Sequence, residues 1–482
     1  MDLRRALTRM GVSRQITLGL SLLSLLFLSR LLPPAAFGIF ALGIALQVIA
    51  ALVIDFGVRA ELVRRPALRD RSLGEAAGFL TFTTAVVVGG GLCLTWLFGR
   101  GAQGSGDLGA VISVLLIGLL PLPVVIPLES QLQRAGRFDG LSIINIVITA
   151  TDKTVAVILA FAGLGAFSLA IGVVAGRVVQ LLLLLKMVRG TRRFHRPRRT
   201  GWARYWRSGP ALSGGEVIGP TSDLAVASII AGGLGAFVLG VYNRANALFS
   251  LVDSALLQGV RPVILPAFTR ALASGVRGAD IFATKFSYLS ALCWPAFAVM
   301  ALLADPIIHV LLGDQWEASV RPVQILCLVG VAYPVTQLAN VLFISVGAEK
   351  AYARVQITQH TVRIIGVAIG AAVSLEFVCL ALAVAAWTNA GLMLRKLSQL
   401  MPMPMAQLGQ LARDGILMTF AALMGPAILV GFVDGSNAPS FFVASGGILL
   451  SLMGWIGCLF WLDHPLSQHV RQLLVRMIDG RT

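Results

Sequence analysis

Charged side chains inside long apolar segments are the residues of this sequence best suited to do chemistry. Lys153, Arg177, Arg244 and Arg363 each lie well inside such a segment. An ionisable group at the bilayer centre costs at least ~2.5–3.5 kcal/mol on insertion scales, so it usually faces a bundle interior or a watery cavity. Cations there favour an anionic ligand, and arginine suits phosphate because its fork donates two parallel hydrogen bonds. We therefore predict that these four residues bind an anionic substrate group such as pyrophosphate.

Acidic residues accompany these cations. We predict that Glu216, Asp223, Asp152 and Asp253 couple an ion or balance charge, since helical spacing aligns them with other polar residues on single helix faces. The alternative is structural, because Asp152 with Lys153, or Asp223 with Arg244, would also form neutralising pairs between or within helices. The predicted polar faces are Asn145, Thr149 and Asp152; Glu216, Pro220 and Asp223; Asn246, Ser250 and Asp253; and Gln356, His360 and Arg363.

The segments that must position these residues are membrane spans. The chain is 57% hydrophobic and 13% charged, with a mean hydropathy of +0.85. A helix needs roughly 20 apolar residues to cross a hydrocarbon core about 30 Å thick. We predict an all-α polytopic membrane protein with about fourteen spans. Their expected limits are 12–32, 38–59, 77–98, 108–129, 141–162, 164–186, 210–231, 234–260, 281–304, 320–346, 355–375, 377–394, 414–433 and 439–461.

The distribution of basic residues sets the expected topology. With fourteen spans, 32 of the 39 Lys and Arg residues fall on one side. Cytoplasmic loops are enriched in Lys and Arg, so this side is expected to be the cytoplasm. We therefore predict a protein of the bacterial inner membrane with both termini in the cytoplasm. The net charge of +17 is then explained by topology and by contact with anionic membrane lipids, and we expect no nucleic-acid partner.

The two halves of the chain are related in sequence. A shift of 202 positions places Gly38 on Gly240 and Ala45 on Ala247. This predicts two six-helix lobes related by a pseudo-twofold axis along the membrane normal, plus a C-terminal helix pair. The expected parts are an N-terminal lobe, a basic cytoplasmic linker, a C-terminal lobe, the helix pair and a cytoplasmic tail, at 1–188, 189–208, 209–398, 399–462 and 463–482.

The basic linker mixes arginines with Trp202, Tyr205 and Trp206. One interpretation is an interfacial helix with its aromatic rings at the level of the lipid headgroups. The other is a docking surface for a partner enzyme.

Catalytic and cofactor motifs are missing from the sequence. It contains no Walker motif, HExxH, GxSxG or dinucleotide fingerprint, and its five cysteines stand singly within spans. We therefore predict no catalytic residue, no metal site and no cofactor. A membrane glycosyl- or acyl-transferase would need a large outer loop, and the longest one expected here, about 305–320, is too small.

Three stretches resemble the polysaccharide-transport family of lipid-linked oligosaccharide flippases. They are GGLGAFVLGVYNRANAL (Gly232 to Leu248), which follows Asp223, then LPAFTRA (Leu265 to Ala271) and LLGDQWEASVRPVQIL (Leu311 to Leu326). The family lies within the superfamily of multidrug, oligosaccharidyl-lipid and polysaccharide exporters.

The resemblance implies movement of an undecaprenyl-pyrophosphate-linked oligosaccharide across the inner membrane by alternating access. It also implies polysaccharide polymerases and glycosyltransferases as partners. Beyond Arg14 at its cytoplasmic end, the first span carries only Arg30 near its outer end, unlike the acidic and arginine-rich first span of peptidoglycan-precursor flippases. A cation-coupled drug antiporter of the same superfamily is the alternative function.

Overall fold

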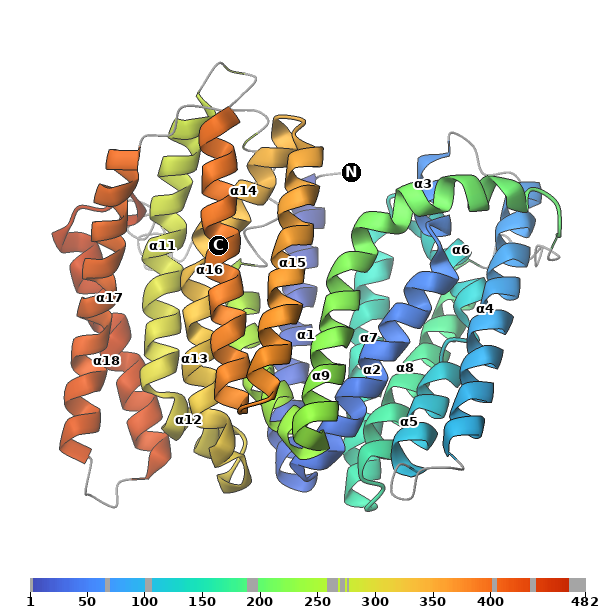
Figure 1. The fold of residues 1–482 in the computed structure, drawn as a ribbon, viewed down its shortest axis with the longest axis horizontal. Coiled ribbons are helices and arrows are strands. Elements are labelled where there is room, and N and C mark those ends of the chain that lie inside the picture. The colour runs from blue at the N-terminus through green and yellow to red at the C-terminus, as the bar shows by residue number, and fades with distance from the viewer. Residues whose placement is uncertain are drawn as a thin grey trace. The chain divides into compact units, whose positions relative to one another are not determined.

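The computed structural model describes two compact units. The described residues are 3–65, 70–99, 106–188, 198–257, 268, 274, 277–400, 405–433 and 439–467. Unit 1 comprises residues 1–243 and unit 2 comprises residues 244–482. All regular structure in the described ranges is helical (Figure 1), as the sequence predicts.

Unit 1 is built from α1 to α8 and most of α9. The helix α7 packs against α1 and α8, while α5 contacts α2, α4 and α8, and α6 contacts α3 and α4. The helices are α1 (Leu3–Leu31), α2 (Pro34–Asp55), α3 (Val58–Arg64), α4 (Asp70–Gly99), α5 (Gly106–Ile117), α6 (Leu122–Arg134), α7 (Phe138–Phe161), α8 (Ala166–Met187) and α9 (Trp202–Leu257).

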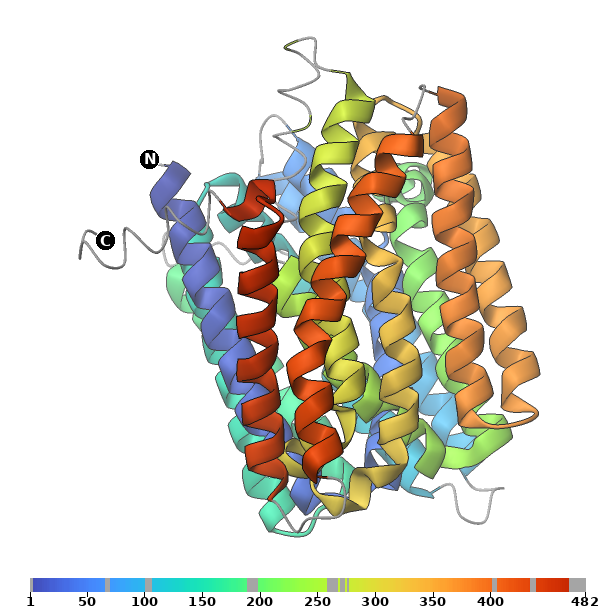
Figure 2. The same ribbon diagram turned by 90° about the vertical axis from the view of Figure 1, so that its left-hand side faces the viewer.

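Unit 2 is built from the end of α9 and from α11 to α18. The helix α11 packs against α13, α14 and α17, and α15 pairs with α16. Figure 2 shows α17 and α18 side by side, and they share an extensive contact. The helices are α11 (Gly278–Leu302), α12 (Ala304–Leu311), the 3-10 helix η1 (Asp314–Ser319), α13 (Val320–Val331), α14 (Tyr333–Ser345), α15 (Glu349–Ala371), α16 (Leu375–Leu400), α17 (Met405–Val433) and α18 (Ser440–Trp461).

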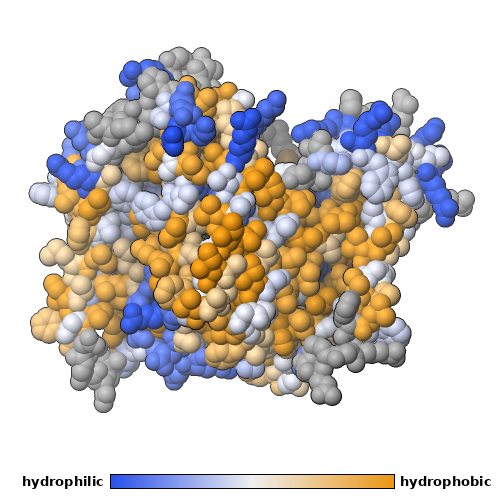
Figure 3. Space-filling model, viewed as in Figure 1, coloured by the Kyte–Doolittle hydropathy of each residue, from blue (hydrophilic) through white to orange (hydrophobic). Residues whose placement is uncertain are grey.

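The helices have the length and surface of membrane spans. In the described ranges ten are long and apolar enough to cross a membrane, or up to twelve if each bent pair counts as one span. Large apolar side chains point outward, for example Phe432 and Trp461, which are 82% and 78% exposed. Figure 3 shows hydrophobic residues along the helices and hydrophilic ones gathered at the helix ends.

Two segments account for the difference from the fourteen predicted spans. The apolar part of α9, Val217–Leu256, is 40 residues long, which at ~1.5 Å per residue is about twice the membrane thickness. This run holds most of the predicted seventh and eighth spans, and Gly235 interrupts it with a φ of 91°. The other segment is α15, which coincides with the predicted eleventh span but carries Lys350, Arg354 and Arg363 and so is too polar to qualify by composition.

The predicted fourth and tenth spans are not continuous helices. The first breaks between α5 and α6 with a bend of 47°, and the second between α13 and α14 with a bend of 43°. The reason is proline, which has no N–H to continue the helical ladder. Pro121 and Pro123 lie at the first break and Pro334 at the second. Both segments lie where the fourth and tenth spans are predicted, and the bend in each is a feature that the sequence analysis did not predict.

Side chains from neighbouring helices bind backbone carbonyls at both breaks. Gln47 of α2, 4% exposed, donates from Nε2 to the Leu115 carbonyl at 2.7 Å. In unit 2, Trp294 of α11 donates from Nε1 to the Val331 carbonyl at 2.9 Å, and Trp387 donates to the Leu328 carbonyl at 3.1 Å. An unpaired buried carbonyl is costly, so these donors stabilise each bend.

The helices α2 and α9 cross with their backbones in contact. A Cβ added to Gly38 would lie 1.8 Å from the Ala236 carbonyl oxygen, and one added to Gly240 would lie 1.8 Å from the Pro34 carbonyl oxygen. Pro34 and Ala236 are related by the same shift of 202 positions as Gly38 and Gly240. The crossing is therefore locally symmetric, with repeat-related residues contacting each other.

Candidate functional site

A chain of hydrogen-bonded charged residues links α2, α3, α6 and α8 within unit 1. Arg59 donates from Nη1 to Glu129 Oε2 at 2.5 Å. Its backbone N–H donates to Asp55 Oδ1 at 3.0 Å, which holds the first turn of α3 against the end of α2. The turn between these helices needs a left-handed backbone at Phe56 and Gly57, with φ of 42° and 76°.

Arg177 of α8 joins this chain through Gln180. Gln180 is 4% exposed and donates from Nε2 to Glu129 Oε1 at 2.5 Å. Its own Oε1 accepts a hydrogen bond of 2.9 Å from Arg177 Nη1. Glu129, whose side chain is 13% exposed, therefore accepts hydrogen bonds from two different helices. The residues Asp55, Arg59, Glu129, Gln180 and Arg177 are called the polar network below.

Asp152 and Lys153 form an ion pair on α7. The Lys153 Nζ lies 2.9 Å from Asp152 Oδ2, and the two side chains are 34% and 19% exposed. Close packing of α7 on α8 is possible because Gly172 faces the Asp152 backbone, where a Cβ would lie 2.6 Å from the carbonyl oxygen. The Asp152 charge also acts on Arg177. Three of the predicted site residues are thus brought together in unit 1.

The remaining predicted residues lie on α9 and α15. Arg244 and Asp253 are half-buried on α9 and Arg363 is half-buried on α15, all three in unit 2. Asp223 is exposed on the part of α9 that belongs to unit 1. The side chain of Glu216 lies outside the described residues.

The positive and negative charges of the polar network, taken together with Asp152 and Lys153, are equal in number. Arg59, Arg177 and Lys153 face the carboxylates of Asp55, Glu129 and Asp152. An arginine has five N–H donors. Arg177 donates one of its N–H groups to Gln180, which leaves donors for a ligand. The carboxylates of these residues neutralise the arginines and the lysine. A phosphate oxygen can replace a carboxylate oxygen as the hydrogen-bond acceptor of a guanidinium group.

Sequence reasoning missed Arg59, Glu129, Gln180 and Gln47. Arg59 and Glu129 fall at span ends, where charges are common and carry little information. Gln180 lies three residues after Arg177, so the two share a helix face and could have been paired from spacing. Gln47 is an amide within an apolar span, and a buried polar group needs a partner. The sequence does not show which helix supplies that partner, because this depends on the tertiary fold.

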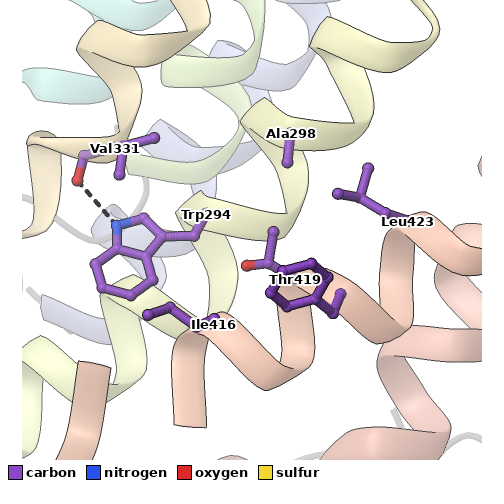
Figure 4. Close-up of a pocket in the computed structure, with 7 residues that line it drawn as sticks. Trp294, Ala298, Val331, Ile416, Thr419 and Leu423 are labelled. Atoms are coloured by element: carbon purple, nitrogen blue, oxygen red, sulfur yellow. Dashed lines mark hydrogen bonds between the residues drawn. The ribbon is translucent and has the colours of Figure 1, made fainter. Parts of the chain in front are cut away.

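An apolar cavity lies beside the second break, within unit 2 (Figure 4). Its volume is about 180 Å³, below the ~300–1,000 Å³ of typical ligand pockets. Its polar side-chain atoms are already used, because Trp294 donates to Val331 and Thr419 Oγ1 donates to the Gly415 carbonyl at 2.7 Å. The cavity therefore offers nothing to a pyrophosphate. The lining residues are Trp294, Ala298, Val331, Ile416, Thr419, Phe420 and Leu423.

Comparison with known proteins places the chain in a family. The model of the polysaccharide biosynthesis protein family matches residues 27–321, more than half of the chain. The chain belongs to this family. The match contains the polar network, the first helix break, and Lys153, Arg177 and Arg244, and it ends at the start of α13, before the second break.

Two curated relatives carry names from polysaccharide biosynthesis. The lipopolysaccharide biosynthesis protein WzxC of Escherichia coli K12 is 21% identical over 324 residues, covering 66% of this chain and 65% of the relative. The succinoglycan biosynthesis transport protein ExoT of Rhizobium meliloti is 23% identical over 312 residues, covering 63% and 61%. The chain thus spans less than two thirds of the length of these relatives. The name of ExoT describes a transport protein, which is consistent with the expectation of a non-enzyme.

Solved structures show the same fold. The lipid II flippase MurJ in an inward closed conformation has a TM-score of 0.77 at 11% identity, covering 94% of this chain and 99% of the other. An inward-facing multidrug resistance MATE transporter has a TM-score of 0.56 at 15% identity, covering 82% and 98%. At these identities the likeness establishes the fold alone, the all-helical fold that these two membrane proteins share and that the sequence predicts.

Proposed function

We propose that this protein moves undecaprenyl-pyrophosphate-linked oligosaccharide repeat units across the bacterial inner membrane. The product would be an exopolysaccharide, a capsule or an O-antigen. The observation that carries this proposal is membership of the polysaccharide biosynthesis family, with relatives named for lipopolysaccharide and succinoglycan biosynthesis. The fold shared with a lipid II flippase supports transport of a large lipid-linked substrate by alternating access.

In this proposal the cations contact the substrate's phosphates. Lys153, Arg177, Arg244 and Arg363 are the proposed contacts, and Arg177 is supported most directly because Gln180 positions its guanidinium beside Glu129. Without substrate the carboxylates keep the cations neutralised. An arriving pyrophosphate competes with them, and bidentate hydrogen bonding favours the exchange. Glu216, Asp223, Asp152 and Asp253 are the proposed charge-balancing or ion-coupling groups.

The proposed orientation places both termini in the cytoplasm. It is supported by the 32 of 39 Lys and Arg residues that fall on one side of the predicted topology. The proposed partners are the enzymes that supply and consume a lipid-linked oligosaccharide, namely glycosyltransferases and a polymerase. The proposed parts remain 1–188, 189–208, 209–398, 399–462 and 463–482.

Complementation of a deletion strain tests the proposal. Arg177→Ala and Arg363→Ala are expected to abolish surface polymer while the protein stays in the membrane at normal level. Arg395→Ala removes an exposed arginine of α16 and serves as the control that retains export. Wild-type export by both site variants would reject the site assignment. A deletion strain with normal polymer and increased drug sensitivity would instead favour the antiporter function.

A further inference from the structure

A surface of unit 1 combines exposed arginines with exposed tryptophan. Residues 198–210, called the docked segment, lead into α9 and include its first turns. The predicted seventh span begins at residue 210, where the docked segment ends, so we expect the docked segment to lie at the edge of the membrane core. Figure 1 shows this part of α9 lying across the ends of α3 and α4.

One side of the docked segment is fixed to the helices beneath it. Tyr205 is 1% exposed, with its ring 5.2 Å from that of Phe79 on α4. Gly209 is buried, and a Cβ there would lie 2.3 Å from the Phe56 ring. Before the helix begins, the Arg198 N–H donates to the Gly74 carbonyl at 3.0 Å. The segment is therefore part of unit 1, and its orientation on α2 and α4 is set.

This packing turns two arginines and a tryptophan outward. Arg204, Trp206 and Arg207 are exposed, and Trp206 keeps 53% of its surface accessible although its ring centroid lies 5.2 Å from that of Phe56. On α4, Phe82 is 43% exposed and lies 5.1 Å from the Trp202 ring. Aromatic rings beside arginines at the edge of an apolar span are typical of the headgroup region of a bilayer.

The charges around this surface leave a positive excess. Arg198 and Arg199 are exposed, and the Arg71 side chain is 69% exposed. The nearby carboxylates are largely engaged: Glu75, 9% exposed, pairs with Arg71 at 3.1 Å, and Glu61 pairs with Arg65 at 3.3 Å. Asp70 is an exposed carboxylate of the same surface. With Arg65, Arg204 and Arg207 included, six arginines of this surface face three carboxylates, so the described part of the surface carries more positive than negative charge.

We propose that the docked segment is a binding surface for anionic phospholipid headgroups, in which Arg204 and Arg207 contact the phosphate and Trp206 inserts beside the acyl chains. The positive excess selects anionic over zwitterionic headgroups. The surface also connects to the polar network, because Trp206 packs on Phe56, which lies in the turn between Asp55 and Arg59. This inference is independent of which lipid-linked sugar the protein transports.

Quenching of Trp206 fluorescence by brominated lipids tests the proposal. The full-length protein is reconstituted in phosphatidylcholine doped with either brominated phosphatidylglycerol or brominated phosphatidylcholine. The Trp206 signal is the difference between the wild type and Trp206→Phe, which keeps an aromatic ring against Phe56. We expect brominated phosphatidylglycerol to quench with an apparent affinity about fivefold or more above that of brominated phosphatidylcholine. Attraction of one arginine to an anionic lipid surface is worth about 1 kcal/mol, which corresponds to about fivefold in affinity. The preference should shrink at 1 M salt.

Two double variants separate this surface from general basicity. Arg204→Gln with Arg207→Gln should bring the two lipids to equal quenching. Arg395→Gln with Lys396→Gln removes the same charge from exposed positions of α16 and should leave the preference unchanged. Equal quenching by both lipids in the wild type would overturn the proposal, as would a preference that survives in the first double variant. If neither brominated lipid quenched Trp206, the proposal would also be overturned, and an acidic protein partner would be favoured.

Discussion

Glu129 is the residue on which the polar network depends. It accepts a hydrogen bond from Arg59 of α3 and another from Gln180 of α8, so its two oxygens connect helices that are distant in sequence. Removing one partner of a buried ion pair costs about 3–5 kcal/mol, because a charge is left uncompensated. Arg59 is 35% exposed, and water therefore screens part of this cost.

Glu129→Gln should lower the free energy of unfolding by about 1–2 kcal/mol. The neutral amide accepts more weakly than a carboxylate and leaves Arg59 without its counterion. The measurement is the thermal unfolding midpoint in mild detergent. Glu317→Gln, at an exposed position of η1, is the matched control and should match the wild type. Equal midpoints for both variants would show that the network contributes nothing to stability.

His464 gives unit 2 a predictable pH dependence. It is 3% exposed, and its Nε2 lies 2.6 Å from the Ser287 hydroxyl. Burial lowers the pKa of His464 below 6.5, and the Asp414 charge opposes this shift. The folded protein therefore resists protonation of His464 more than the unfolded chain does. Stability from this residue is complete above about pH 6.5 and is lost as the pH falls through the folded pKa.

Thermal unfolding between pH 5 and pH 8 measures this effect. His464→Asn should show a shallower loss of stability at acidic pH than the wild type. The same slope in both proteins would mean that other groups cause the acid dependence.

At the scale of the elements, the broken spans are the most informative feature. Interrupted helices in corresponding positions of two repeats mark binding regions in transporters, because they bring backbone dipoles into a cavity. In this protein the breaks are maintained by side chains from other helices, Gln47 at the first and Trp294 and Trp387 at the second. The donor types differ, so the two halves reach the same bend by different chemistry.

Trp294→Phe should destabilise the fold by about 1–2 kcal/mol, since it leaves the Val331 carbonyl without its indole donor while keeping an aromatic ring. Trp461→Phe, at a position 78% exposed, is the control and should have little effect. Thermal unfolding of the two proteins in the same detergent gives the comparison. An effect no larger at Trp294 than at Trp461 would contradict the assigned role.

Gly38→Ala tests the crossing of α2 and α9. Its Cβ would overlap the Ala236 carbonyl, so we expect a loss of about 3 kcal/mol or failure to fold. Gly89→Ala is the control, because nothing lies within 4 Å of a Cβ there. In that helix interior alanine is expected to be neutral or stabilising by about 0.5–1 kcal/mol. Membrane-inserted protein level and unfolding midpoint report both variants, and a tolerated Gly38→Ala would contradict the close crossing.

For the whole molecule, apolar length and charge position predicted most of the fold. The predicted limits 141–162 and 439–461 fall within a few residues of α7 and α18. Two residues that the internal shift of 202 positions relates, Gly38 and Gly240, contact each other at the α2 and α9 crossing, which the sequence did not predict. The helix breaks were missed because an apolar segment reads the same whether straight or bent. The polar network was missed because spacing identifies a helix face but not the helix that it meets.

The most direct measurement of the central claim is lipid translocation by the purified full-length protein. Proteoliposomes would contain an undecaprenyl-pyrophosphate carrying a labelled sugar, and an impermeant enzyme would report how much label reaches the outer leaflet. We predict faster translocation than in protein-free vesicles, loss of this activity in Arg177→Ala, and retention in Arg395→Ala. Translocation by the wild type at the protein-free rate, or equal rates in the wild type and Arg177→Ala, would contradict a pyrophosphate-binding flippase.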